Sequence, residues 1–301
     1  MKRTSPDLDD FSTLNHATID ELVDRMLDED VGAGDITSLS SVPKKATLEA
    51  ALVAREGVVI AGLPIALAVF RRLEPGVKIE VLARDGDIVR EKDTIVTVSG
   101  YAQGLLAAER SALNILQHLS GIATMTRRYA VAIENTGAKL LDTRKTIPGL
   151  RRFAKYAAKM GGAQNHRMGL FDAILIKDNH IAIAGGIAPA IKAAKKRHKW
   201  IEIECDTLEQ VDESLAEGVD RILLDNMGTE TMKEAVRRAN GVELEASGNV
   251  TLERIREIAM TGVNYISVGR ITMSSPAVDI GMDYTGEKAS ETPGFIRAVR
   301  R

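Results

Sequence analysis

The sequence predicts a two-domain α/β protein: an N-terminal α/β sandwich-like domain followed by an open, incomplete parallel βα barrel. Three observations indicate this class. The 301 residues exceed the roughly 150 that are typical of one domain. Short apolar stretches recur about every twenty residues in the C-terminal half, with helix-like segments between them. Strands such as 221–225 (RILLD) are nearly all apolar until their last residue, which is typical of a sheet buried on both faces.

The composition excludes several classes of protein. Lys and Arg total 40 against 42 Asp and Glu, so the formal charge is −2, far from the basic balance of a general nucleic-acid binder. The single cysteine, Cys205, permits no intramolecular disulfide and suits a reducing compartment. No apolar run approaches the roughly 20 residues that span a bilayer, and the charged first ten residues lack a signal-peptide core. We therefore expect a cytoplasmic protein whose partners include neither nucleic acid nor membrane.

The predicted first domain covers residues 1–115, of which residues 1–14 read as a polar tail. Helical spacing of apolar residues predicts a helix at 18–27. Short strands are expected after it at 46–54, 78–82 and 94–99. A long helical run over 105–135, interrupted near Gly121, contains the domain boundary.

The predicted barrel covers residues 116–275, and residues 276–301 form a C-terminal return segment and tail. Its strands are expected at 139–142, 173–178, 200–206, 221–225, 242–247 and 265–269. Helices are expected between the last of them, at 210–217, 230–240 and 252–261. Because these units fall short of a full eightfold barrel, we expect the barrel to be open.

Polar residues or glycine stand where each predicted barrel strand ends. The segments are DTRK at 142–145, KDNH at 177–180, ECD at 204–206, DN at 225–226, SGN at 247–249 and GR at 269–270. One charged strand end is ordinary solvent-facing polarity. A whole series favours a shared active site, because barrel enzymes place their chemistry at the carboxyl ends of the strands.

The residue types at this predicted mouth narrow its chemistry. Four fixed cations would gather there, enough to bind a polyanion: Arg144, Lys145, Arg167 and Lys177. Glu204 and Asp225 end neighbouring strands and offer the oxygen ligands that Mg²⁺ takes alongside substrate phosphates, although salt bridges to the same lysines explain them equally well. The five histidines have no metal-ligand spacing, so a zinc site is not expected.

Several stretches, taken together, resemble the quinolinate phosphoribosyltransferase family, and the resemblance runs from about residue 18 to residue 283. In the first half they are EDVGAGDIT at 29–37, ERSALN at 109–114 and SGIAT at 120–124. In the second half they are DTRKTIPGLR at 142–151, NHRMGL at 165–170, LIKDNH at 175–180, LDNM at 224–227 and EASGN at 245–249.

The resemblance implies a fold, an assembly and a reaction. The fold is the two-domain arrangement predicted above, assembled as a homodimer or a higher multiple of dimers. The N-terminal domain of one subunit covers the barrel mouth of its partner. The implied reaction joins quinolinate to phosphoribosyl pyrophosphate with magnesium present and releases pyrophosphate and carbon dioxide.

The resemblance also implies the site residues. The dicarboxylate of quinolinate would be held by Arg110, Arg144, His166, Arg167 and Lys177. The ribose and pyrophosphate would be held by Lys145 with Glu204 and Asp225, the two carboxylates acting partly through magnesium. The remaining substrate-binding residues would be Thr143, Ser247, Gly248, Asn249, Val268 and Gly269, with the 5-phosphate at 247–249 and Gly269. The implied catalytic residues are Lys145, Lys177, Glu204 and Asp225.

Two positions depart from the family pattern: Arg270, where a small residue is common, and Met273, where histidine is frequent. Both belong to the rim of the predicted phosphate loop. The sequence leaves two alternatives, which are the molybdenum-transport-associated relative of the family and a non-catalytic protein that binds a phosphorylated ligand. The second would have no need for three arginines that face a dicarboxylate.

Overall fold

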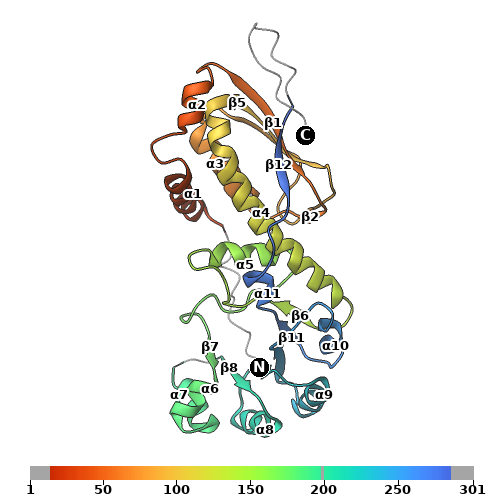
Figure 1. Cartoon of the computed structure of the whole chain (residues 1–301). Helices are drawn as coiled ribbons and strands as arrows, with labels where there is room; N and C mark the ends of the chain where they lie inside the picture. The colour runs from red at the N-terminus through yellow and green to blue at the C-terminus, as the bar shows by residue number, and fades with distance from the viewer. Residues whose placement is uncertain (1–13, 198–199, 286–301) are drawn as a thin grey trace. The chain divides into compact units, whose positions relative to one another are not determined.

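The computed structural model describes residues 14–197 and 200–285 (Figure 1). The described residues divide into two compact units. The N-terminal unit comprises residues 16–117 and 278–285, and the barrel unit comprises residues 118–277. The predicted tails at 1–14 and 286–301 lie, apart from Leu14, outside the described residues.

The N-terminal unit is built on an antiparallel sheet. Its strands are β1 (Thr47–Ala54), β2 (Val58–Val59), β3 (Lys78–Val81), β4 (Ile88–Val89), β5 (Thr94–Tyr101) and β12 (Ile280–Tyr284). Its helices are α1 (His16–Asp30), α2 (Ile36–Ser41), α3 (Leu63–Leu73) and the first half of α4 (Ala102–Ala132). The main sheet has the order β12-β1-β5-β3, and β2 pairs with β4. The return segment of the chain therefore supplies an edge strand to a sheet formed by residues about two hundred positions earlier.

The helix α3 differs from the expectation of strands alone between residues 46 and 99. Its apolar residues are buried around most of its circumference, and Pro64 stands in its first turn. A short, nearly continuous apolar run shows no periodicity that separates a buried helix from a buried strand. That ambiguity is why the sequence pattern did not predict α3.

The interruption expected near Gly121 is wrong, because α4 continues through this residue. A Cβ atom on Gly121 would lie 2.1 Å from the carbonyl oxygen of Pro276 and 3.2 Å from Cα of Ala277. The glycine therefore permits close packing of the returning chain against α4. Glycine marks a close backbone approach here, and the helix does not end.

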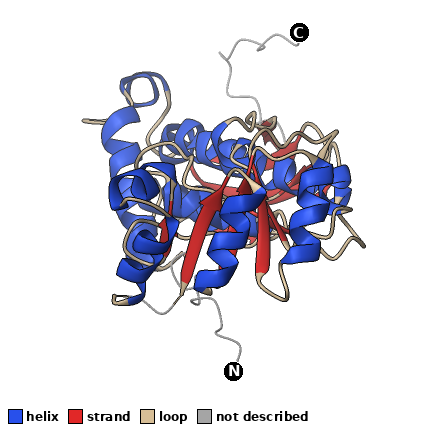
Figure 2. Cartoon of the chain, turned by 90° about the horizontal axis from the view of Figure 1, so that it is seen from below, coloured by secondary structure: helices blue, strands red, loops and turns tan. Residues whose placement is uncertain are grey.

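The barrel unit contains one six-stranded parallel sheet. Its strands are β6 (Lys139–Leu141), β7 (Ile174–Ile176), β8 (Ile201–Cys205), β9 (Arg221–Asp225), β10 (Glu243–Ser247) and β11 (Tyr265–Ser267). Its helices are the second half of α4 with α5 (Arg151–Met160), α6 (Asp178–Ala184), α7 (Ile187–Lys195), α8 (Leu208–Glu217), α9 (Thr229–Arg238), α10 (Ile255–Ala259) and α11 (Arg270–Met273). The spatial order is β6-β11-β10-β9-β8-β7. Figure 2 shows strands, in red, with helices, in blue, lying alongside them. The α/β class with an open parallel barrel is confirmed.

The barrel is open between β6 and β7, which are neighbours in the chain but do not pair. Gln164 lies beside this gap and hydrogen-bonds to the end of β6 through a single β-bridge. The amide of Gln164 donates to the carbonyl oxygen of Leu140 (2.8 Å), and the amide of Asp142 donates to that of Gln164 (3.2 Å). This single bridge brings the next residues, Asn165 to Arg167, to the carboxyl end of β6.

Candidate active site

A pocket of about 800 Å³ lies at the carboxyl ends of the parallel strands. All candidate residues of the barrel unit line it: Thr143, Arg144, Lys145, His166, Arg167, Lys177, Glu204, Asp225, Ser247, Gly248, Asn249, Val268 and Gly269. Arg110 is an exposed residue of α4 in the other unit and is not part of this lining. Arg270 and Met273, the two departures from the family pattern, also line the pocket.

Two arginines of the pocket stand close enough to repel each other. Burial lowers the pKa of Arg167, and the charge of Arg144 lowers it further. The Nη1 of Arg167 donates to the carbonyl oxygen of Ala173 (3.1 Å), and Nε of Arg144 is buried without a partner. Within the described residues, neither guanidinium forms an ion pair with a carboxylate. Such an arrangement favours an anion in the pocket, because an orphaned buried donor is costly.

The two candidate carboxylates differ in their surroundings. Glu204 forms an ion pair with Nζ of Lys177, with its Oε2 at 2.5 Å from the amine. The alternative interpretation of Glu204 as a salt-bridge partner is thus realised. Asp225 accepts a hydrogen bond from Nδ2 of Asn226 (2.7 Å) and has no cationic partner among the residues that the structure describes. Asp225 can therefore accept a cation or a ribose hydroxyl.

Tight turns carry the residues that follow β9 and β10. Gly248 has a φ of 92°, and a Cβ there would lie 2.2 Å from Oδ1 of Asn226. Nδ2 of Asn249 donates to that same oxygen (3.0 Å), and both asparagines have positive φ. Only glycine fits between the two loops, so they form one compact rim.

A buried ionic network lies beneath two segments of the pocket, residues 143–145 and 165–167. Asp142 and Lys155 form an ion pair with both side chains fully buried. The Asp142 carboxylate also accepts from the amide of His166 (2.9 Å) and from Nδ2 of Asn165 (2.6 Å). Nζ of Lys155 donates to the carbonyl oxygen of His166 (2.8 Å). Because Asp142 directly follows β6, this network fixes residues 143–145 and 165–167 relative to each other.

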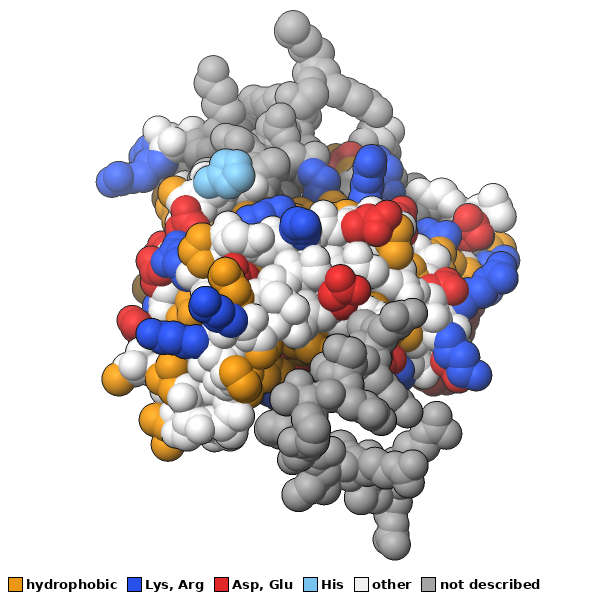
Figure 3. Space-filling model, turned by 90° about the horizontal axis from the view of Figure 1, so that it is seen from above, with side chains coloured by type: hydrophobic (Ala, Val, Ile, Leu, Met, Phe, Trp, Pro, Cys, Tyr) orange, Lys and Arg blue, Asp and Glu red, His pale blue; other side chains and the backbone are white. Residues whose placement is uncertain are grey.

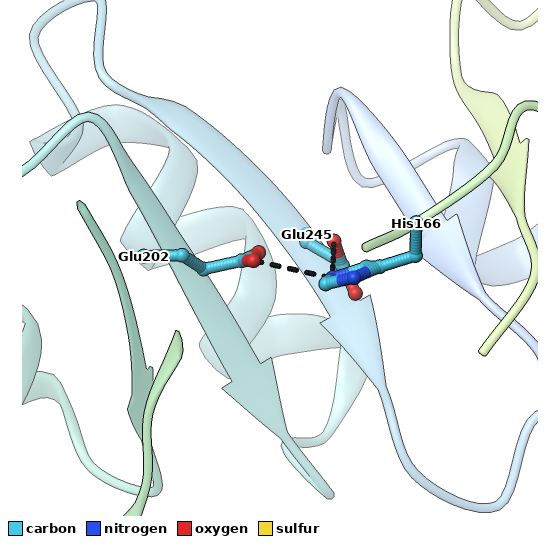
Figure 4. A group of neighbouring side chains, drawn as sticks. All are labelled: His166, Glu202 and Glu245. Atoms are coloured by element: carbon cyan, nitrogen blue, oxygen red, sulfur yellow. Dashed lines mark ion pairs between the residues drawn. The ribbon is translucent and has the colours of Figure 1, made fainter. Parts of the chain in front are cut away.

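A second group of charged residues, which the pattern of strand ends does not reveal, lies deeper in the barrel. His166 Nε2 lies 3.1 Å from Oε2 of Glu202 and 3.5 Å from Oε2 of Glu245 (Figure 4). Nη1 of Arg221 lies 3.5 Å from Oε2 of Glu245. We call Glu202, Arg221 and Glu245 with His166 the barrel cluster. All four side chains are at least nine-tenths buried.

The charges of the barrel cluster shift one another's pKa values. Burial and then the charge of Glu245 raise the pKa of Glu202. Burial would raise the pKa of Glu245, but His166 and Arg221 outweigh it and lower the pKa to about 2. Burial lowers the pKa of His166, but Glu245 and Glu202 raise it more strongly. One contact opposes a second ring proton, because the amide of Arg167 donates to Nδ1 of His166 (2.8 Å).

A period of two along each strand was the available signal for this cluster. Glu202 precedes Glu204 by two residues, and Glu245 precedes Ser247 by two, so each pair points to one face of the sheet. Glu202 and Glu245 stand before the polar residues that end their strands, so the pattern of strand ends does not include them. The cluster was also hidden because its histidine lies in the gap between β6 and β7, far from both glutamates in sequence.

Comparisons with known proteins agree with this geometry. The quinolinate phosphoribosyl transferase N-terminal domain matches residues 35–120, and the C-terminal domain of the same family matches residues 122–283. A probable nicotinate-nucleotide pyrophosphorylase (carboxylating) of Synechocystis is 45% identical and aligns over 88% of this chain and 92% of its own length. Its counterpart in Bacillus subtilis is 41% identical over 90% of this chain and 95% of its own.

Solved structures with similar folds carry the same description. A nicotinate-nucleotide pyrophosphorylase from Francisella tularensis superposes with a TM-score of 0.89 at 39% identity, covering 94% of this chain and 100% of that one. One from Ehrlichia chaffeensis gives a TM-score of 0.86 at 43% identity, covering 91% of this chain and 100% of that one.

Proposed function

The chain belongs to the quinolinate phosphoribosyltransferase family, and we propose that quinolinate and phosphoribosyl pyrophosphate meet in the pocket described above. The enzyme transfers the phosphoribosyl group from phosphoribosyl pyrophosphate to quinolinate with decarboxylation, in NAD biosynthesis. The products are nicotinate mononucleotide, pyrophosphate and carbon dioxide. Neither the molybdenum-transport-associated relative nor a non-catalytic binding protein is favoured by these matches.

One observation supports the choice of this pocket above all. Arg144 and Arg167 face each other's charge there, and no described carboxylate pairs with either. A dicarboxylate substrate supplies the missing negative charge and accepts hydrogen bonds in the planar geometry that guanidinium groups offer. Lys177 adds a third cation, and Arg110 adds a fourth if a second subunit presents it.

The remaining lining residues of the pocket suit phosphoribosyl pyrophosphate. Lys145, free of an ion pair in the described chain, is placed for the pyrophosphate, with Thr143 beside it. Asp225 and Glu204 are placed for the ribose hydroxyls. The rim residues Ser247, Gly248, Asn249, Val268 and Gly269 are placed for the 5-phosphate, where glycine allows close approach of loop amides.

The chemistry requires little proton transfer. The pyridine nitrogen of quinolinate attacks C1 of the ribose while the bond to pyrophosphate breaks, and the positive charge on the sugar is oxocarbenium-like. Asp225 and Glu204 stabilise that charge electrostatically, and Lys145 stabilises the departing pyrophosphate. The positive pyridinium nitrogen then stabilises the electron pair that the departing carbon dioxide leaves on the adjacent ring carbon, and that carbon takes up a proton from solvent. No general base is needed.

The carboxylates of Glu204 and Asp225 are suitable ligands for magnesium. The ion takes one or two carboxylates together with substrate phosphates, and Glu204 and Asp225 end adjacent strands of the barrel. Asp225 in particular forms no ion pair with any cation of the described segments. A bound Mg²⁺ would neutralise charge on the pyrophosphate, and the two carboxylates would hold it directly or through water.

The proposal also includes the oligomeric state, the partners and the location of the enzyme. A homodimer, or a multiple of dimers, would bring Arg110 of one subunit to the mouth of the other. None of the described helices has the length and apolar character needed to cross a bilayer. Side chains of both signs are interspersed on the face in Figure 3, in keeping with the net charge of −2, so nucleic acid is not proposed as a partner. The lone buried Cys205 supports a cytoplasmic location.

Pyrophosphate release tests the function directly. Purified protein with phosphoribosyl pyrophosphate and Mg²⁺ should release pyrophosphate and carbon dioxide in equal amounts when quinolinate is added. Nicotinate, which lacks the second carboxylate, should support little release. Equal turnover of nicotinate would contradict the assignment of the arginines to a dicarboxylate.

A further inference from the structure

We propose that Glu202 and Glu245 are positioning residues of the substrate site: they orient the His166 ring, which in turn fixes Arg167. Neither glutamate has a part in the reaction described above. The inference rests on the proposed function, because Arg167 is assigned there to the substrate dicarboxylate. It concerns how the barrel interior supports that residue.

The ring of His166 makes contacts with protein groups at both of its nitrogens. Nε2 lies 3.1 Å from Glu202 and 3.5 Å from Glu245, and Nδ1 accepts the amide of Arg167 at 2.8 Å. Figure 4 shows the ring pointing between the two carboxylates. The residue also lines the pocket. Through its Nδ1 contact, His166 holds its neighbour Arg167.

Arg167 is held at two points as a result. Its amide is bound by His166, and Nη1 of its guanidinium is bound by the carbonyl oxygen of Ala173. Its side chain is almost fully buried and still lines the pocket. Burying a guanidinium beside Arg144 is unfavourable unless the fold enforces it, so the contacts of His166 serve to keep Arg167 in place.

Arg221 supports the cluster at Glu245. Its guanidinium packs on the rings of Tyr265 and Trp200, at 3.9 and 5.2 Å from their centroids, and Nη1 lies 3.5 Å from Oε2 of Glu245. Glu202 stands opposite Arg221 in the register of β8 and β9. Because both glutamates stand on central strands of the sheet, they give His166 a rigid support.

A divalent metal is the competing occupant of this cluster, since His166, Glu202 and Glu245 bring three potential ligand atoms within 4.8 Å of one another. A metal on Nε2 would leave the ring proton on Nδ1, where it would point at the amide proton of Arg167. Arg221 already provides positive charge beside Glu245. These two contacts favour an ion-pair cluster without metal. The carboxylate oxygens of both glutamates are buried without a hydrogen-bond partner among the described residues, so the test also measures the metal content of the protein.

The test compares Glu202→Gln and Glu245→Gln with Glu243→Gln. Glu243 is a matched control because it lies on the same strand as Glu245 and pairs with Arg221 at 3.0 Å, but its side chain is 41% exposed. The measurements are the KM values for quinolinate and for phosphoribosyl pyrophosphate, calorimetric binding of quinolinate, and the metal content of the purified protein.

We expect both cluster variants to raise the quinolinate KM and dissociation constant on the order of 10- to 100-fold, since small displacements of a positioning contact have such effects. The KM for phosphoribosyl pyrophosphate should change less than about twofold, and Glu243→Gln should resemble the wild type. If the glutamine variants do not fold, Glu202→Asp decides, because it keeps the charge but withdraws the carboxylate from Nε2. A selective rise in quinolinate KM is again expected.

Three results would overturn the inference: unchanged quinolinate affinity in the folded cluster variants, equal loss for both substrates, or stoichiometric zinc or manganese that leaves with these glutamates. Failure of the proposed function would look different, because the wild-type protein would then release no pyrophosphate with quinolinate.

Discussion

At the scale of single residues, the binding of a carboxylate in the pocket depends on the planar hydrogen-bond geometry of guanidinium groups as well as on their charge. Arg144 has a buried Nε without a partner, and Arg167 lies close enough for their charges to interact. Lysine would preserve the charge of Arg144 but would lose the two parallel hydrogen bonds that a guanidinium donates to a carboxylate.

Arg144→Lys should therefore reduce kcat/KM for quinolinate on the order of 10- to 100-fold, the range for a lost charge-assisted hydrogen bond. The unfolding midpoint should stay close to that of the wild type. Steady-state kinetics with quinolinate as the varied substrate measures the effect. Arg237→Lys, an exposed change on α9, is the control. Wild-type efficiency in Arg144→Lys would refute a bidentate role.

Asp225 offers a second prediction at this scale, because none of the described cations pairs with its carboxylate. Asp225→Asn should raise the KM for phosphoribosyl pyrophosphate, and the Mg²⁺ concentration for half-maximal rate, on the order of tenfold or more. Binding of quinolinate, measured alone by calorimetry, should be nearly unchanged. Glu230→Gln, at an exposed position of α9, controls for loss of an acidic side chain. A selective loss of quinolinate binding would show that Asp225 serves the other substrate.

At the scale of elements, the placement of loops depends on unusually close contacts between segments. The network of Asp142 and Lys155 ties the loop after β6 to residues 165–167. Because Gly121 in the middle of α4 has no side chain, the backbone at Pro276 can pack directly against the helix at this point. That passage carries the chain from the last barrel strand toward β12.

Gly121→Ala should lower the free energy of unfolding, which is opposite to the usual effect of this change inside a helix. Alanine in a helix interior normally stabilises by about 1 kcal/mol relative to glycine. Here the added Cβ would lie 2.1 Å from a backbone oxygen, so we expect a loss of about 1–3 kcal/mol in the free energy of unfolding.

Urea denaturation measures this change. Gly228→Ala is the control, because nothing lies within 4 Å of a Cβ at that position. A stabilised Gly121→Ala protein would show that the returning chain does not constrain α4.

At the scale of the whole molecule, the proposed site requires residues from two copies of the chain. All candidate residues but Arg110 line the pocket of one barrel unit. A dimer in which each N-terminal unit covers its partner's barrel would complete the site with this arginine. Activity would then depend on assembly.

Mixing inactive Arg110→Ala protein with inactive Lys145→Ala protein should restore activity. With random exchange, half of the dimers are mixed and each contains one site with neither lesion. About a quarter of the wild-type activity per site is then expected, provided that the two sites act independently. The separate variants are the controls, and native mass measurement verifies exchange. Verified heterodimers without activity would assign Arg110 to its own subunit.

The sequence by itself determined the repeat of strands and helices, the open parallel barrel and the polar strand ends that line the pocket. These features are encoded locally: a strand buried on both faces is mostly apolar, and polar residues at its carboxyl end reach the mouth. Glu204, Asp225 and the segment 247–249 could be found for this reason.

Only the tertiary structure decided which residues stand behind that mouth. His166 reaches Glu202 and Glu245 because residues 164–167 occupy the gap beside β6, and no local pattern encodes that gap. Likewise Gly121 reads as a helix break until Pro276 is placed against it, and β12 has no partner until β1 is beside it. Each of these depends on contacts between residues far apart in sequence, whose energies propensity and periodicity do not contain.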